Sequence, residues 1–362
     1  MMPTNSAPEL MRPQSRSAIL ETIQERGPIS RVDLARLLKL NPATVTRITR
    51  LLLEEDLICE TGEGTTPGAG RKPTLLSFNH RARLLTAIYA GRNGVTGVIA
   101  DTSGAILTRH TLLPDPALAS QTFHTLLNEL LAADPSYRRR LASACLCAAP
   151  PAQITPGLCD SISETLDIPV ITAEDVELAA LGEATWGAGR ERPHFGLLWL
   201  GHTSRFCLYL DGILRAGGLG YDAAGQPFAA RLSDRGLVIA AQSLLENDTT
   251  SAIHDLTQTR RLSARLIFEA AQQHDPLARA VIDTAAGDLA QVVLGLADVL
   301  TLDLMILGGA WTPAAPLLIP AVYEHLHALG TPLPTVITAE LGDDAPLLGA
   351  IKLALDHSGL TG

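Results

Sequence analysis

The sequence has few of the features that mark secreted or membrane-embedded proteins. It contains 5 cysteines, and aromatic residues make up 4% of its 362 residues. The charge-free stretch Leu304–Tyr323 is interrupted by two glycines and three prolines, which does not suit a membrane helix. The N-terminal segment has no apolar core like that of a signal peptide. We therefore expect a cytoplasmic protein with no membrane partner and no disulfide framework.

Acidic residues exceed basic ones overall, but not at the N-terminus. The net charge is −10, yet residues 1–75 carry ten Lys and Arg against nine Asp and Glu. A small module can bind a polyanion even when the whole chain is acidic, because the local potential decides.

The pattern along the chain predicts three parts. Residues 1–15 are interpreted as a disordered arm, and residues 16–80 as three short helices followed by a hairpin. Residues 81–362 alternate strand-like and helix-like segments, which indicates an α/β fold.

Helix-capping signals organise the first module. The first helix should stop before Gly27 and Pro28, and Ser30 with Asp33 resembles a capping box for a second helix. Asn41 and Pro42 suit the N-cap and first position of a third helix.

The third helix, at about 43–55, has two different faces. Val45, Ile48 and Leu52 recur at helical spacing and should pack inward. The other face is polar and basic, as a helix placed in a DNA major groove requires. The predicted DNA contacts of this unit are Ser30, Arg31, Asn41, Pro42, Ala43, Thr44, Thr46, Arg47 and Arg50. The alternative is a small helical bundle used for protein contacts.

A glycine-rich loop follows the third helix. It spans Gly62–Pro73, between strands expected at Leu57–Cys59 and Thr74–Phe78, and ends with Arg71 and Lys72. These cations suit a wing that enters the minor groove. The alternative is a linker with two solvated cations. The wing interpretation makes the module a winged helix-turn-helix.

Several motifs together resemble the ROK family of repressors and sugar kinases. They are Gly27–Leu34 (GPISRVDL), Pro42–Thr46 (PATVT), Gly70–Pro73 (GRKP), Asp175–Glu183 (DVELAALGE), Ile306–Gly309 (ILGG) and Pro346–Ala350 (PLLGA). The resemblance implies an actin-like domain of two lobes. One lobe would cover about 81–190 plus the C-terminal helix, and the other about 191–340. It also implies a homodimer or tetramer and a sugar-like effector.

The chain departs from the family's kinase pattern at most of its chemical motifs. Tyr89 stands where kinases have the first acidic residue, and Arg205 replaces a glycine of a phosphate loop, which removes the close backbone approach. Gln226 and Ala229 stand where sugar-binding members have Glu and His. The Cys-rich zinc loop is missing, since Ser233–Gln242 contains no cysteine. We therefore expect no catalytic residue, no metal and no cofactor.

Four residues remain as candidate ligand contacts: Asp175, Glu177, His202 and Gln226. The resemblance places Asp175 at the position of the kinase general base, which would take a proton from a sugar hydroxyl. Asp175 is also open to capping its helix or accepting a ligand hydroxyl. His202 is open to lining a remodelled cleft or to being an ordinary loop histidine.

These observations predict a transcriptional repressor in carbohydrate metabolism, bound as an oligomer to a palindromic operator in double-stranded DNA. An ATP-dependent sugar kinase with an attached DNA-binding domain is the alternative. A third possibility is a domain that has lost its ligand and serves only as a scaffold.

Overall fold

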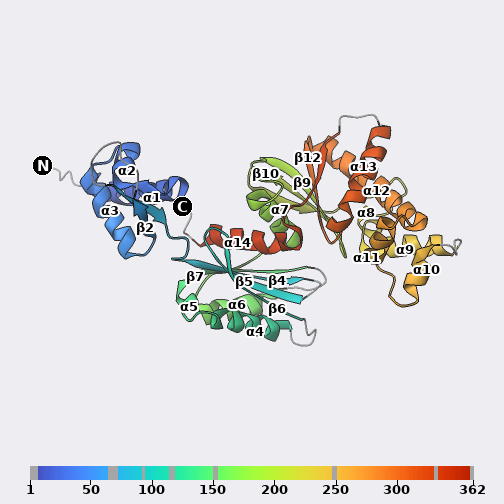
Figure 1. Cartoon of the computed structure of the whole chain (residues 1–362), viewed down its shortest axis with the longest axis horizontal. Helices are drawn as coiled ribbons and strands as arrows, with labels where there is room; N and C mark the ends of the chain where they lie inside the picture. The colour runs from blue at the N-terminus through green and yellow to red at the C-terminus, as the bar shows by residue number, and fades with distance from the viewer. Residues whose placement is uncertain are drawn as a thin grey trace.

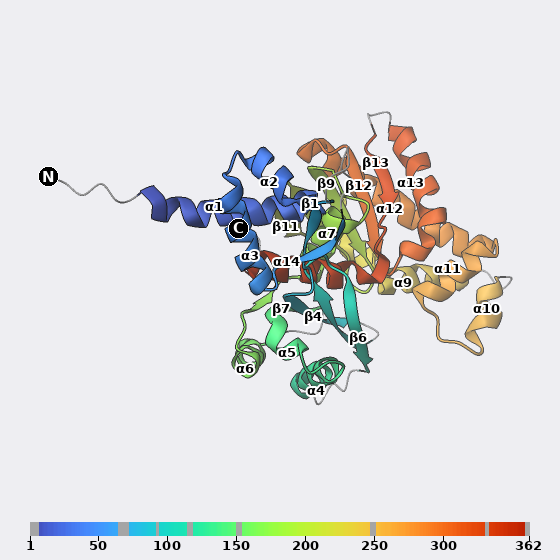
Figure 2. The same ribbon diagram turned by 60° about the vertical axis from the view of Figure 1, so that its left-hand side comes forward.

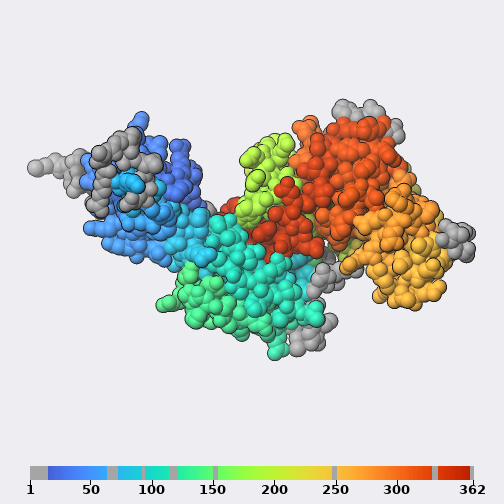
Figure 3. Space-filling model, viewed as in Figure 1, coloured from blue at the N-terminus to red at the C-terminus, as the bar shows by residue number. Residues whose placement is uncertain are grey.

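The computed structural model describes residues 7–63, 72–91, 94–113, 119–149, 154–246, 251–329 and 333–358. An N-terminal module stands at one end of the molecule, and two α/β lobes follow it (Figures 1 and 3). The module adjoins the first lobe, so the three parts form an elongated molecule.

The N-terminal module is a winged helix-turn-helix. Its elements are α1 (Ala7–Arg26), β1 (Ile29–Ser30), α2 (Arg31–Leu38), α3 (Pro42–Glu54), β2 (Ile58–Glu63) and β3 (Thr74–Phe78). The three strands pair in the order β1-β3-β2. Val45, Ile48 and Leu52 are buried against Ile19 and Leu34, as their spacing predicts.

The start of α1 corrects one expectation. Residues 7–15 belong to the helix, which begins at Ala7, and not to a disordered arm. Extending an existing helix costs no new nucleus, and Glu9, Leu10 and Met11 are good helix formers. Figure 2 shows this end of α1 projecting away from the rest of the molecule. Residues 1–6 of the expected arm lie outside the described residues.

The first lobe is a five-stranded sheet covered on both faces. Its strands are β4 (Leu84–Gly91), β5 (Gly94–Asp101), β6 (Ile106–Leu112), β7 (Leu141–Ala148) and β8 (Val170–Thr172), in the order β6-β5-β4-β7-β8. One face packs on α4 (Ala119–Ala132) and α6 (Pro156–Leu166), and the short α5 (Tyr137–Arg140) lies beside them. The other face packs on α14 (Ala345–His357), and Cys145 and Cys147 are fully buried there.

The second lobe repeats this layering with a larger helical layer. Its strands are β9 (His194–Leu200), β10 (Arg205–Leu210), β11 (Ile213–Gly217), β12 (Leu304–Gly309) and β13 (Thr335–Thr338), in the order β11-β10-β9-β12-β13. The helices on one side are α8 (Phe228–Arg231), α9 (Asp234–Leu245), α10 (Ala252–Thr257), α11 (Ala264–Gln272), α12 (Pro276–Leu300) and α13 (Ala315–Leu329). On the opposite face lies α7 (Asp175–Trp186).

Two helices join the lobes through close backbone contact. A Cβ on Gly349 of α14 would lie 1.8 Å from the Leu178 carbonyl oxygen of α7, and one on Gly182 would lie 2.4 Å from the Ala345 carbonyl oxygen. Glycine at both positions therefore permits the two helices to touch. Because α7 packs on the second sheet while Leu178 joins the core of the first, it belongs to both lobes.

The helix α13 was not predicted from the sequence. Pro316 lies near its start and Pro320 inside it, and prolines normally indicate helix breaks. Leu318, Val322 and Leu326 are nevertheless spaced four residues apart and buried at 1%, 0% and 0% exposure. Tertiary packing thus outweighs the local penalty.

Within the residues that the structure describes, one helix is long and apolar enough to cross a membrane. In α12, however, 56% of the most apolar window is buried inside the second lobe, which is typical of a core helix.

Candidate functional site

The first turn of α3 forms the leading end of the helix-turn-helix. The Asn41 side chain accepts a hydrogen bond of 2.9 Å from the Ala43 amide, and Pro42 takes the first helical position. Both predicted capping roles are confirmed. Asn41, Pro42 and Ala43 are exposed, so this end of the helix can approach another molecule.

The remaining predicted contacts on α3 share one face. Thr46, Arg47 and Arg50 are exposed and Thr44 is half-buried. Within the described residues Arg47 has no ion-pair partner, while Arg50 Nε lies 3.7 Å from Glu54 Oε1 with both side chains more than 60% exposed. An exposed pair of this kind contributes little, so Arg50 can exchange Glu54 for a phosphate or a base.

Two predicted DNA contacts turn inward. Ser30 is 2% exposed, and its hydroxyl accepts a hydrogen bond from the Asp33 amide and donates one of 2.7 Å to the Asp33 carboxylate. Arg31 donates from Nε to Thr49 Oγ1 at 3.2 Å and from Nη2 to Glu60 Oε1 at 2.9 Å. The Ser30 hydroxyl and the Nε and Nη2 groups of Arg31 are therefore used within the module.

The wing is described only in part. The strands β2 and β3 pair as predicted, and Lys72 is exposed before β3. Arg71 lies outside the described residues. Lys39 was not among the predicted DNA contacts. It is exposed between α2 and α3, with a backbone φ of 53°. Its position in the turn between the two helices, next to Leu40 and Asn41, is the sequence feature that could have marked it as a candidate DNA contact.

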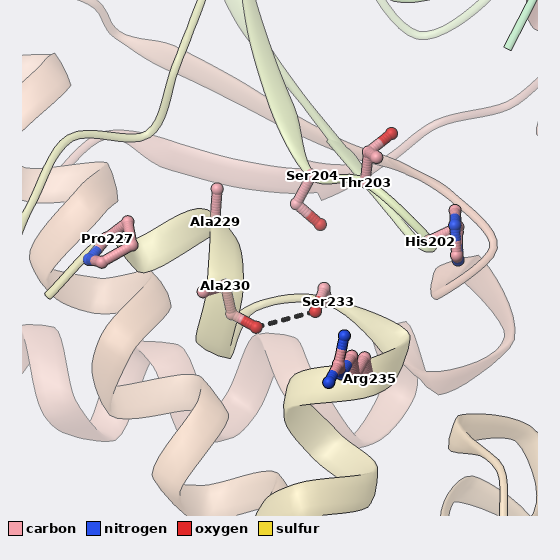
Figure 4. Close-up of a pocket in the computed structure, with 8 residues that line it drawn as sticks. All are labelled: His202, Thr203, Ser204, Pro227, Ala229, Ala230, Ser233 and Arg235. Carbon is pink, nitrogen blue, oxygen red and sulfur yellow. Dashed lines mark hydrogen bonds between the residues drawn. The ribbon is translucent and has the colours of Figure 1, made fainter. Parts of the chain in front are cut away.

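A pocket of about 440 Å³ opens in the second lobe (Figure 4). Its lining comes from the loop after β9, the segment around α8 and the start of α9: His202, Thr203, Ser204, Pro227, Ala229, Ala230, Ser233 and Arg235. The bridge between Gly201 and Ser233 brings these segments together. The hydroxyls of Ser204 and Ser233 donate to the Leu232 and Ala230 carbonyls.

The pocket gathers only one of the four predicted ligand residues. His202 lines it, and no hydrogen bond of His202 occurs within the described residues. Gln226 is exposed in a turn, where its backbone N–H donates to Asp222 Oδ1 at 2.8 Å, and it adjoins the lining residue Pro227. Asp175 and Glu177 do not line this pocket.

Asp175 lies in a separate cluster at the start of α7. It is 4% exposed, and its Oδ1 accepts a hydrogen bond of 2.9 Å from the Val176 amide. Arg205 pairs with Glu174 and lies 3.9 Å from Asp175. Burial raises the pKa of Asp175, and burial followed by the charge of Asp175 raises the pKa of Tyr89. The carboxylate thus faces neighbours from three elements.

An ion-pair cluster centres on Arg231, just before Ser233–Gln242, the segment where the resemblance would place a zinc loop. Arg231 of α8 pairs with Asp288 through two hydrogen bonds of 2.7 Å and also pairs with Asp222. Its guanidinium carbon lies 5.1 Å from the Phe228 ring centre. Across the described residues, no group of three or more His, Cys, Asp or Glu side chains is placed to hold a metal ion.

These features define a protein with a winged helix-turn-helix joined to an actin-like domain of two lobes. Residues 152–357 match the model of the ROK family, and residues 13–59 match that of the MarR family. The chain belongs to the ROK family.

Two curated relatives are regulators by name. The DNA-binding transcriptional dual regulator NagC of Escherichia coli strain K12 is 25% identical, over 95% of this chain and 93% of that protein. The xylose repressor of Bacillus subtilis strain 168 is 26% identical, over 48% of this chain and 49% of that protein.

Solved structures share the fold. A ROK family transcriptional regulator described as a homologue of the E. coli MLC protein superposes with a TM-score of 0.76 at 21% identity, over 97% of this chain and 98% of that one. A ROK family glucokinase from Streptomyces griseus in complex with glucose and AMPPNP superposes with a TM-score of 0.63 at 20% identity, over 75% of this chain and 99% of that one. The second match leaves about a quarter of this chain uncovered.

Proposed function

We propose that this protein is a cytoplasmic transcriptional repressor that binds operator DNA through α3 and senses a sugar-related effector through its C-terminal domain. The observation that carries the proposal is the exposed face of α3. Arg47 and Arg50 lie one turn apart on it, and Thr46 lies beside them. Guanidinium groups pair with guanine edges and phosphates, and hydroxyls serve either base or backbone.

We also propose a dimer with two α3 helices on a palindromic operator. Half-sites one helical turn or a multiple apart would match twofold symmetry. The C-terminal domain is the natural source of the dimer contacts, because it contains most of the chain.

The pocket around His202 is the proposed effector site. His202, Thr203 and Arg235 supply donors, while Pro227 and Ala229 supply an apolar wall. A few polar groups on a partly apolar wall are typical of sites for small polar ligands. An effector that favours one lobe arrangement would shift the population of DNA-competent dimers.

A titration of the full chain tests the DNA-binding part. Labelled DNA from upstream of its own gene should bind more tightly than scrambled DNA of equal composition, and binding should weaken steeply with salt. Arg190→Ala, at an exposed position of the C-terminal domain, is a matched control and should bind like the native protein. Equal affinity for both DNAs would contradict a sequence-specific regulator.

An ATP-dependent sugar kinase is the second candidate, favoured by the likeness to the glucokinase fold and by the position of Asp175. Tyr89 opposes kinase activity, because it stands where the kinases have the first acidic residue. Its ring also lies close to Gly91, where an added Cβ would be 2.8 Å from Tyr89 Cε1. A coupled phosphorylation assay over common hexoses and amino sugars should give no turnover. Turnover that disappears in Asp175→Asn would establish the kinase instead.

A further inference from the structure

Arg31 connects three elements of the DNA-binding module. It is the first residue of α2, and its side chain is 29% exposed. Nε donates to Thr49 on α3, and Nη2 donates to Glu60 on β2. These partners lie 18 and 29 residues away in sequence, so the contacts are tertiary.

The contact with Thr49 reaches the backbone of α3. Thr49 is fully buried, and its hydroxyl donates to the Thr46 carbonyl oxygen at 3.2 Å. The exposed residues Thr46 and Arg50 lie on either side of Thr49 in the helix. A bond to this hydroxyl therefore opposes rotation and sliding of α3 relative to α2.

The contact with Glu60 fixes the base of the wing. Glu60 pairs opposite Leu76 on β3, and the register of β2 shifts between Glu60 and Glu63. Regular pairing thus ends at Glu60, and the chain beyond it leads into the wing loop. Arg31 holds the strand at the last point before this irregularity.

We propose that Arg31 is a positioning residue, which sets α3 and the wing strand β2 in the relative arrangement that DNA requires, and that it does not contact DNA itself. This inference rests on the proposed function. The edge of the guanidinium formed by Nε and Nη2 is already occupied, and hydrogen bonds that involve charged groups are worth more than neutral ones.

The proposal makes an unusual prediction for Glu60. Removing a carboxylate near DNA should tighten binding if only charge matters. If Arg31 acts by position, Glu60→Gln should instead weaken binding, because it weakens the ion pair that holds β2.

The first test measures affinity and its salt dependence in the full chain. Arg31→Ala should weaken operator binding roughly 10-fold, the loss expected for hydrogen bonds to a charged group, and leave the salt slope unchanged. Glu60→Gln should weaken binding a few-fold, and the double variant should be no weaker than Arg31→Ala alone. If the plot of log affinity against log salt concentration becomes less steep by about 0.9 in Arg31→Ala, a phosphate contact has been lost. That result would overturn the proposal. Tighter binding by Glu60→Gln would also overturn it.

The second test needs no DNA. Hydrogen exchange of amides in α3 and β2 should speed up in Arg31→Ala and Glu60→Gln, and less in Arg31→Lys, which keeps the ion pair. Arg36→Ala is the control: it removes an exposed arginine from the same helix, paired at 3.0 Å with Asp33, and should leave both elements unchanged. Unchanged exchange in Arg31→Ala would overturn the proposal. Absence of specific binding by the native chain would count against the proposed function alone.

Discussion

The N-terminal module and the C-terminal domain hold their polar side chains in opposite ways. On α3, Arg47 and Arg50 are exposed. Among the described residues, their one ion pair joins Arg50 to Glu54 at 3.7 Å, and both of those side chains are exposed. At the start of α7, Asp175 is buried and faces Arg205, Glu174 and Tyr89 from its own protein. The difference indicates that α3 keeps its basic side chains accessible, whereas the charged groups around Asp175 contact one another.

The largest effect should follow from removing the exposed arginines. Each of Arg47 and Arg50 should contribute about 1–3 kcal/mol if it reads a base, so Arg47→Ala/Arg50→Ala should weaken operator binding at least about 30-fold. Fluorescence anisotropy with the full chain measures this loss. Thermal unfolding should be unchanged, since both side chains are exposed. Retained affinity would remove α3 as the contact surface.

A core substitution should separate the two regions by stability. Leu52 is 0% exposed in the core of the module, so Leu52→Ala should cost about 2–5 kcal/mol. Scanning calorimetry should show an earlier transition for the module and an unchanged one for the C-terminal domain. A single transition that shifts as a whole would mean that the two regions unfold as one cooperative unit.

Effector binding should act on the C-terminal domain. A sugar derivative at 100 times its Kd stabilises a protein by about 2.7 kcal/mol, which a thermal-shift panel detects. His202→Ala should abolish the shift, while Ser358→Ala, at the end of α14 and outside the pocket, should keep it. A shift that survives His202→Ala would place the ligand elsewhere.

The smallest effect concerns the pH dependence of stability. Because burial raises the pKa of Asp175 above its ordinary value of 3.8, the folded protein binds a proton that the unfolded chain releases. The stability of the native protein should therefore fall, relative to Asp175→Asn, as the pH rises from about 3.8 through the raised value. Melting temperatures of both proteins across this range measure the difference. Asp298→Asn, at an exposed position, should track the native protein. A relative rise in native stability with pH would show that Arg205 outweighs burial.

Local patterns predicted the module well because its signals are local. The caps at Ser30 and Asn41 and the spacing of Val45, Ile48 and Leu52 lie within a few residues of the helices they define. The inward position of Arg31 could not be predicted, since its partners become neighbours only after folding.

The C-terminal domain shows the same limit. The alternation of strand-like and helix-like segments predicted an α/β fold, which the two sheets and their helices confirm, but two prolines hid α13. The pocket depends on a bridge between Gly201 and Ser233, 32 residues apart by their numbering, and no local pattern marks such a pairing. This explains why Arg235, which lines the pocket beside His202, was not predicted as a ligand contact.

Footprinting of the full chain on the DNA upstream of its own gene tests the central claim most directly. We predict protection of two half-sites related by twofold symmetry, one helical turn or a multiple apart, and loss of that protection in Arg47→Ala/Arg50→Ala. Equal protection by this variant and the native protein, or no protected site at low salt, would contradict the assignment of α3 as the helix that reads DNA.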